Sequence, residues 1–98
     1  MMTLVGKEVI YLSPSDESSF FDWLKSIQCV RNVRGVGDEI LVDVDDASVT
    51  DTDLQELLAL FHRYRVDMKQ LKHLVTKANE HWFRDDTNKY WHDAVFGK

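Results

Sequence analysis

The chain has 98 residues, of which 44% are hydrophobic and 30% are charged. This length allows one hydrophobic core but not two, so we expect a single domain over residues 1–98. No apolar run approaches the roughly 20 residues that cross a bilayer, and residues 1–6 lack the pattern of a secretion signal, so we expect a cytoplasmic protein with no membrane partner. The lone Cys29 fits a reducing compartment, and we expect it to be a buried small hydrophobe rather than a nucleophile.

The first third of the chain predicts a strand followed by a helix. Residues 7–12 (KEVIYL) have the apolar, β-branched and aromatic character of a strand. Ser13 then supplies a helix N-cap, Pro14 the first helical position and Asp16 a variant of the capping box. Apolar residues recur at helical spacing along the buried face of this helix, at Phe20, Trp23, Leu24 and Ile27.

The middle of the chain predicts a β-hairpin. Residues 29–34 and 39–45 have strand character, and the intervening residues 35–38 (GVGD) contain two glycines that suit the positive φ of a tight turn. Side chains alternate along the second strand, with Ile40, Val42 and Val44 on the core face and Leu41, Asp43 and Asp45 on the solvent face.

The second half predicts helices only. The first begins at Thr50 or Asp51 and has the apolar face Leu54, Leu57, Leu58 and Phe61. Asp67 and Gln70 form a capping box for a third amphipathic helix, with the apolar face Met68, Leu71, Val75, Ala78 and Trp82. A short last helix is capped by Asp86 or Thr87, ends at Gly97, and packs through Tyr90, Trp91, Ala94, Val95 and Phe96.

The expected order β-α-β-β-α-α-α indicates a small α+β fold. We expect a mostly antiparallel, three-stranded sheet that is covered by helices on one face. Such a sheet leaves an uncovered edge, at which a second copy of the chain can add as a homodimer, and an outer face that is acidic.

Charge is distributed unevenly along the chain. The net charge is −5, yet residues 35–62 contain eight acidic side chains and no Lys or Arg, whereas residues 63–98 contain eight basic and five acidic side chains. Asp51 and Asp53 fall in the first turn of a predicted helix, where acidic groups stabilise the helix dipole. Five other carboxylates of this stretch have no helix to cap: Asp38, Glu39, Asp43, Asp45 and Asp46.

No metal site, cofactor or enzymatic centre is predicted. A calcium loop that starts at Asp43 lacks the required glycine at its sixth position and glutamate at its twelfth, which are Ser48 and Leu54. The four histidines lack zinc-ligand spacing, and the sequence contains no Gly-rich phosphate cradle. His92 and Asp93 are adjacent on a predicted helix and therefore do not face one another, and no nucleophile is placed near them.

Nucleic-acid binding is an alternative function. Residues 51–82 resemble a helix-turn-helix, with Lys69, Gln70, Lys72, His73 and Lys77 on the second helix. The turn lacks glycine, however, and eight consecutive unopposed acidic residues would repel phosphate. We therefore expect nucleic acid to be an unlikely partner.

The acidic stretch has two interpretations. It can be a solvated strand edge that resists aggregation, or it can steer a basic protein partner into place by complementary charge. Tyr11 and Tyr64 would supply aromatic anchors for such a partner. We favour partner binding, through Asp43 and Asp45 first, and then through Asp38, Glu39 and Asp46.

Motifs across most of the chain resemble a group of small uncharacterised bacterial proteins. Residues 59–71 match the pattern ALFxRYxxDMxQL, residues 79–83 match NxxWF and residues 90–97 match YWHxxVFG, and residues 11–14 and 20–24 are similar as well. The resemblance implies a shared fold and a bacterial source rather than an activity. By analogy, small acidic bacterial proteins without an active site suggest an immunity protein or antitoxin that neutralises a basic toxin such as a nuclease.

Overall fold

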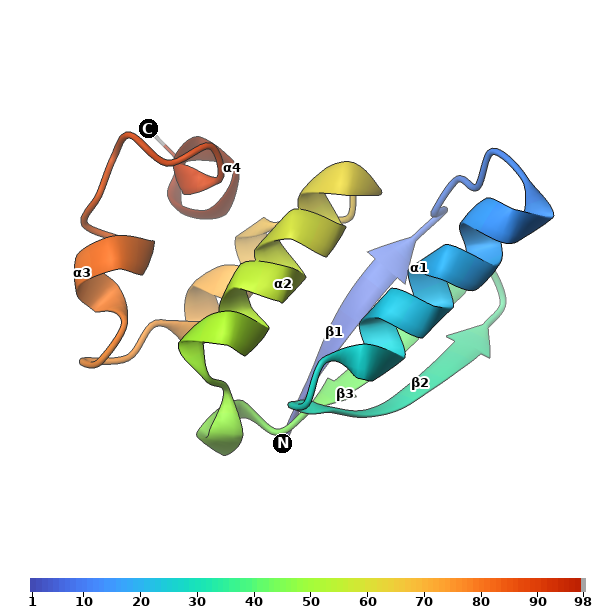
Figure 1. Ribbon diagram of the computed structural model, residues 1–98, viewed down its shortest axis with the longest axis horizontal. Helices are drawn as coiled ribbons and strands as arrows, with labels where there is room; N and C mark the ends of the chain where they lie inside the picture. Colours follow the sequence, from blue (N-terminus) through green and yellow to red (C-terminus); the bar gives the residue numbers. More distant parts are fainter. Residues whose placement is uncertain (98) are drawn as a thin grey trace.

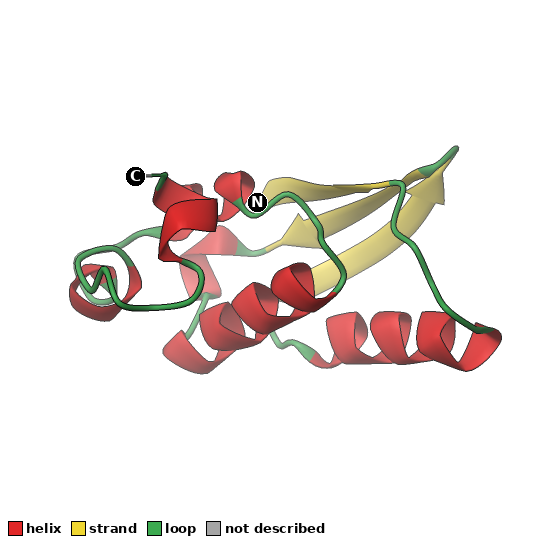
Figure 2. Cartoon of the chain, turned by 90° about the horizontal axis from the view of Figure 1, so that it is seen from above, coloured by secondary structure: helices red, strands yellow, loops and turns green. Residues whose placement is uncertain are grey.

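The computed structural model describes residues 1–97 and contains a three-stranded antiparallel sheet with helices on one side of it (Figure 1). The strands β1 (Met2–Lys7), β2 (Val30–Val36) and β3 (Glu39–Val44) are arranged in the order β1-β3-β2. Helices α1 (Pro14–Ser26) and α2 (Asp51–Arg63) both lie on the same side of the sheet, and the opposite side is open (Figure 2). The predicted α+β class is therefore confirmed.

The first strand does not lie where the sequence predicted it. Of the predicted residues 7–12, only Lys7 belongs to a strand, because β1 pairs with β3 from Met2↔Val44 to Lys7↔Glu39 and the partner strand begins at Glu39. Glu8 has a φ of 51°, which turns the chain away from the sheet. The side chains of Ile10 and Leu12 are then 75% and 90% exposed. Apolar, β-branched composition alone was a misleading signal here, since a strand also needs a partner along its whole length.

Helix α1 follows the sequence prediction closely. The hydroxyl of Ser13 accepts a hydrogen bond from the backbone N–H of Asp16 at 3.1 Å, as an N-cap should. Of the predicted buried face, Phe20, Leu24 and Ile27 are buried, and Trp23 is half-buried.

The hairpin between β2 and β3 is also confirmed, with a turn shorter than predicted. The strands extend to Val36 and start again at Glu39, so only Gly37 and Asp38 form the turn, and Gly37 has the positive φ of 62° that the tight turn requires. Val42 and Val44 are buried, and Asp43 between them faces away from the core, whereas Asp45 lies just beyond the strand as the N-cap of the next element. A short 3-10 helix, η1 (Asp46–Ser48), follows β3.

Helix α2 supplies much of the hydrophobic core. Thr50 is its N-cap, and a reciprocal capping box joins Thr50 to Asp53, which is buried. A single cluster of buried apolar side chains runs from Leu4 of β1 through α2 to Val95 near the C-terminus. Within residues 1–97, none of the helices is long and apolar enough to cross a membrane.

The predicted third helix is wrong, because it is broken into two short pieces. Residues Lys69–Leu74 form a 3-10 helix (η2), and only Glu80–Phe83 form an α-helix (α3). The buried amide of Asn79 donates to the carbonyl of Leu74 at 3.0 Å and accepts from the backbone N–H of Thr76 at 2.8 Å. These hydrogen bonds hold the chain in a turn at the point where a helix would have continued.

The last helix, α4 (His92–Phe96), ends at Gly97 as predicted, with a φ of 78°. The predicted cap is wrong: Asp86 instead accepts a hydrogen bond from the backbone of Asn88 at 3.0 Å, which forms a local turn before the helix. The indole of Trp91 donates to the carbonyl of Phe83 at 3.0 Å and so ties α4 to α3.

Candidate partner-binding surfaces

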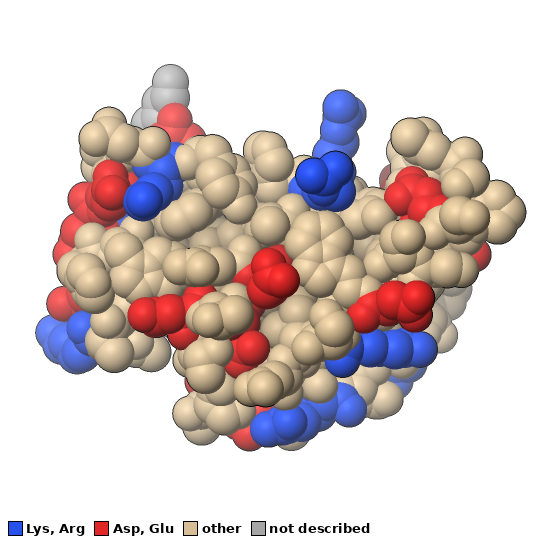
Figure 3. Space-filling view, viewed as in Figure 1, with Lys and Arg blue, Asp and Glu red and all other residues tan. Residues whose placement is uncertain are grey.

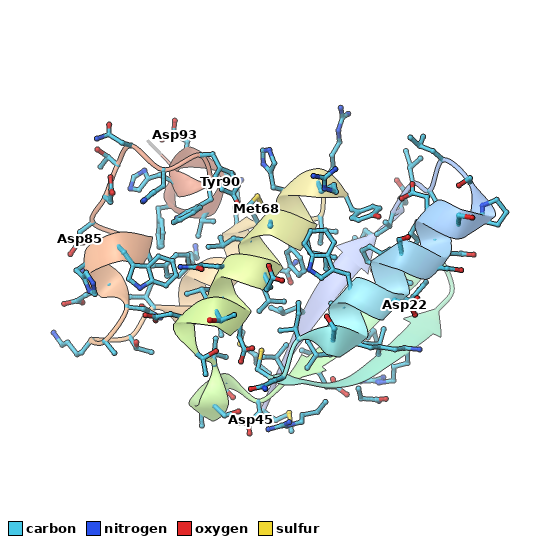
Figure 4. All side chains as sticks on the ribbon, in the orientation of Figure 1. Asp22, Asp45, Met68, Asp85, Tyr90 and Asp93 are labelled. Carbon is cyan, nitrogen blue, oxygen red and sulfur yellow. The ribbon has the colours of Figure 1, made fainter. Side chains whose placement is uncertain are left out.

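The carboxylates that were singled out from the sequence gather on and around β3. We call Asp38, Glu39, Asp43, Asp45 and Asp46 the sheet-face carboxylates. Strand alternation turns Asp43 away from the core, the hairpin turn carries Asp38, and Asp45 and Asp46 lie where β3 passes into η1. Figure 4 labels Asp45 at this end of the sheet. The structure thus places the predicted residues along the central strand β3 and at its two ends.

Asp43 is held by the two strands that flank it. Its Oδ1 accepts a hydrogen bond from the hydroxyl of Thr3 at 2.7 Å and contacts Nη2 of Arg34 at 3.3 Å. These contacts, first from Thr3 and then from Arg34, hold the pKa of the Asp43 carboxyl below its ordinary value. The side chain is therefore ionised throughout the physiological pH range.

Asp45 and Asp46 have their own cationic neighbours. Asp45 contacts Nη2 of Arg31 at 3.3 Å, and hydrogen bonds from Ser48 and then Arg31 lower its pKa. Asp46 contacts the amino group of Met1 at 2.9 Å, and that hydrogen bond lowers the pKa of Asp46 in turn. Both groups are thus negatively charged and paired.

The hairpin end of the sheet is less tightly paired. Glu39 contacts Nζ of Lys7 across the β1–β3 ladder at 3.7 Å. The carboxylate of Asp38 makes no salt bridge to another side chain within residues 1–97, and its backbone carbonyl accepts from Glu8 at 3.2 Å. Asp38 is the sheet-face carboxylate with the fewest internal contacts.

The outer sheet face is consequently mixed in charge rather than uniformly acidic. Sequence reasoning missed the pairing because Lys7, Arg31 and Arg34 lie outside the acidic stretch of residues 35–62 and meet it only through strand pairing. Exposed pairs of this kind contribute about 0–1 kcal/mol each to stability.

A second surface, the basic groove, was not predicted as a site. It is a groove of about 850 Å³ at the C-terminal end of α2, and its lining includes Trp23, His62, Arg63, Arg65, Met68 and Tyr90. Figure 4 labels Tyr90 beside α4 and Met68 beside α2. Basic atoms project from the C-terminal end of α2 in the view of the helical side (Figure 3). The sequence signal for this groove is the run HRYR at residues 62–65, which the helix-turn-helix interpretation treated as a turn.

A third feature is a polar hollow of about 450 Å³ between the end of α1 and the start of α2. Its lining includes Asp53 and Glu56. Cys29 lies close enough to Asp53 for the carboxylate charge to affect the ionisation of its thiol. Burial, and then the charge of Asp53, raises the pKa of the Cys29 thiol to about 12. The thiolate needed for nucleophilic chemistry is therefore scarce at neutral pH, and the predicted burial of Cys29 is confirmed.

His92, which was considered for a catalytic role, contacts other groups of the chain. Nε2 of His92 lies 3.0 Å from the carbonyl oxygen of Arg84, and Nδ1 lies 3.5 Å from the carboxylate of Asp93. Each ring nitrogen thus lies near another group of the chain, and the contact with Asp93 is an ion pair only when the ring is protonated. In the described part of the chain, no three His, Cys, Asp or Glu side chains gather in a way that could hold a metal ion.

The helix-turn-helix geometry is not present within residues 51–82. The second helix, which would have read a DNA groove, is replaced by η2, a turn and the four-residue α3. Lys69 and Lys72 therefore lie on a 3-10 helix, and Lys77 lies in the following turn.

Comparisons of the chain with protein families, with curated proteins and with solved structures give no match in any of the three.

Proposed function

We propose that this protein is a non-enzymatic binding module that neutralises or regulates a basic protein partner, in the manner of an immunity protein or antitoxin acting on a nuclease toxin. The observation that supports the proposal is that the five sheet-face carboxylates lie on β3 or at its two ends, with Asp43 facing away from the buried Val42 and Val44. A surface of this kind attracts a partner with a positive substrate-binding site and orients it during the encounter.

The ion pairs within this surface are weak enough to be replaced by ion pairs with a partner. The contacts of Asp43 with Arg34 and of Asp45 with Arg31 are both 3.3 Å long, and all four side chains are partly exposed. Such pairs are worth about 0–1 kcal/mol, so a guanidinium from a partner can replace Arg34 at little cost. Once the interface excludes water, the new pair is less screened than the old one.

An experiment can test this exchange, because removing the carboxylate of Asp43 and removing the guanidinium of Arg34 should change partner affinity in opposite directions. Proteins captured from a bacterial lysate at low salt are identified by mass spectrometry, and the affinity of the purified partner is then measured for the wild type and for variants. We expect Asp43→Asn with Asp45→Asn to weaken binding of a basic partner at least about tenfold. We expect Arg34→Gln to strengthen binding, because it removes the internal competitor for Asp43.

A matched pair at the other end of the molecule supplies the control. Asp85 contacts Nε of Arg84 at 2.9 Å and is also exposed, and Figure 4 labels it just beyond α3, far from Asp45. Asp85→Asn and Arg84→Gln should leave partner binding unchanged. If Asp85→Asn weakens partner binding as much as the sheet-face variant does, the effect is due to net charge alone. If Arg34→Gln weakens partner binding, Asp43 does not act as the acceptor of a partner cation.

A further inference from the structure

We propose that the basic groove binds an acidic peptide segment of a second protein, with one aromatic or aliphatic anchor residue in the groove and carboxylates on the arginines. The occupant is opposite in charge to the partner of the sheet face, and the inference does not depend on the function proposed above.

The charge of the groove is the first argument. Arg63 and Arg65 both line it, and neither forms a salt bridge with any acidic side chain of residues 1–97. His62 is a third nitrogen-bearing side chain of the lining, and no Asp or Glu is among the lining residues. In a chain of net charge −5, this is a local surface that attracts carboxylates.

The aromatic and apolar lining is the second argument. Tyr90 is 55% exposed and packs edge-on against the ring of His62, with 4.9 Å between the ring centroids. Trp23 contributes from α1, and Val66 and Met68 provide an apolar floor. Tyr, Trp and Arg are the residue types that carry most of the binding energy at protein interfaces. An aromatic or aliphatic side chain of a peptide would bury these surfaces.

The backbone at Arg65 is the third argument. Arg65 has a φ of 58°, a left-handed conformation that is unfavourable for a residue with a side chain. This turn directs the chain from α2 into Val66, whose N–H donates to the carbonyl of Phe61 at 2.9 Å. Glycine would adopt this conformation without strain, but it would not place a guanidinium at the groove.

The size of the groove favours a short peptide segment over a polynucleotide. Its volume of about 850 Å³ lies within the range of a single ligand site. It adjoins the C-terminal end of α2, where the helix dipole disfavours any anion, so Arg63 and Arg65 must supply the attraction for a carboxylate.

The experiment uses a set of fluorescein-labelled acidic octapeptides with Trp, Phe, Leu or Ala at the centre of an Asp/Glu sequence. Binding to the full chain is measured by fluorescence anisotropy and located by two-dimensional NMR shifts. We expect the peptides with Trp, Phe or Leu to bind more tightly than the Ala peptide, with shifts at Trp23 and Tyr90. Arg63→Gln with Arg65→Gln should weaken binding at least tenfold.

A matched variant separates the groove from net charge. Lys69→Gln with Lys72→Gln removes the same two charges from exposed positions outside the groove lining and should change affinity less than twofold. Thermal unfolding of each variant verifies that it is folded. Three results would each overturn the proposal. They are equal losses of affinity in both double variants, tighter binding of an oligothymidine of equal length, and no binding of any acidic peptide at millimolar concentration.

Discussion

The side-chain amide of Gln70 contacts the backbone of Val5 as a further β-strand would. Its Oε1 accepts from the N–H of Val5 at 2.8 Å, and its Nε2 donates to the carbonyl of Val5 at 2.9 Å. Gln70 therefore occupies the outer edge of β1, where two backbone groups would otherwise be available to another strand. In the described part of the chain, no side chain covers the backbone of β2 in this way, so we expect any homodimer through a sheet edge to form at β2.

Gln70→Ala should lower the free energy of unfolding by about 1–3 kcal/mol, because it leaves both partly buried groups of Val5 without a partner. The measurement is urea denaturation followed by circular dichroism. Gln55→Ala is the control, since Gln55 is exposed on α2 and should change stability by less than about 0.5 kcal/mol. Equal stability of the two variants would mean that water replaces Gln70 without cost.

Asn79→Ala should also destabilise the protein, by about 1–3 kcal/mol, although alanine favours helix more than asparagine does. The buried amide of Asn79 satisfies the carbonyl of Leu74 and the N–H of Thr76, and these groups lose their partner in the variant. Thermal or urea unfolding measures the loss, with the exposed Asn88→Ala as control. An Asn79→Ala variant of increased stability would show that a continuous helix competes successfully with the turn.

Stability should decline in acid, and the sheet-face carboxylates should contribute to that decline. The pKa values of Asp43, Asp45 and Asp46 are lowered in the folded protein, so the unfolded chain takes up protons first as the pH falls. The stabilisation is present at neutral pH and is lost as the pH falls below about 4 and through the folded pKa values. Urea denaturation at pH 7, 5, 4 and 3 measures this dependence.

The variant Thr3→Val tests the cause of the acid dependence. It removes the hydrogen bond that contributes most to the lowered pKa of Asp43, so that pKa should rise toward its ordinary value. Stability should then depend less on pH between about 4 and 3 than in the wild type. An unchanged pH dependence would assign the acid sensitivity to carboxylates other than Asp43.

The thiol of Cys29 should be unreactive in the folded protein. Its side chain is completely buried, and its pKa of about 12 leaves very little thiolate at pH 8. A colorimetric disulfide reagent should modify the chain rapidly in 8 M urea and at least about a hundredfold more slowly without urea. Similar rates in both conditions would mean that the region around Cys29 opens frequently.

Local signals in the sequence were sufficient for three elements. The Ser13 cap and apolar spacing located α1, the glycine-containing turn and side-chain alternation located the β2–β3 hairpin, and the apolar spacing from Leu54 to Phe61 located α2. In each case the residues that specify the element are neighbours in the chain, so propensity, capping and periodicity agree.

Elements that depend on distant partners could not be located in this way. The position of β1 was decided by its pairing with β3, which ends at Glu39 and leaves the apolar residues after Lys7 without a partner. The predicted third helix does not form, because the amide of Gln70 bonds to Val5, 65 residues away, and Asn79 stabilises a turn. Helical periodicity did not reveal these competing hydrogen bonds.

The sequence by itself determined the α+β class, the outward direction of Asp43 and the charge of each segment, because these properties follow from local order and composition. Only the tertiary structure decided which charges meet. Strand pairing places Arg34 against Asp43, and the end of α2 together with the turn after it places Arg63 and Arg65 in a groove without carboxylates. Electrostatic energy depends on distance in space, and the folded chain sets that distance.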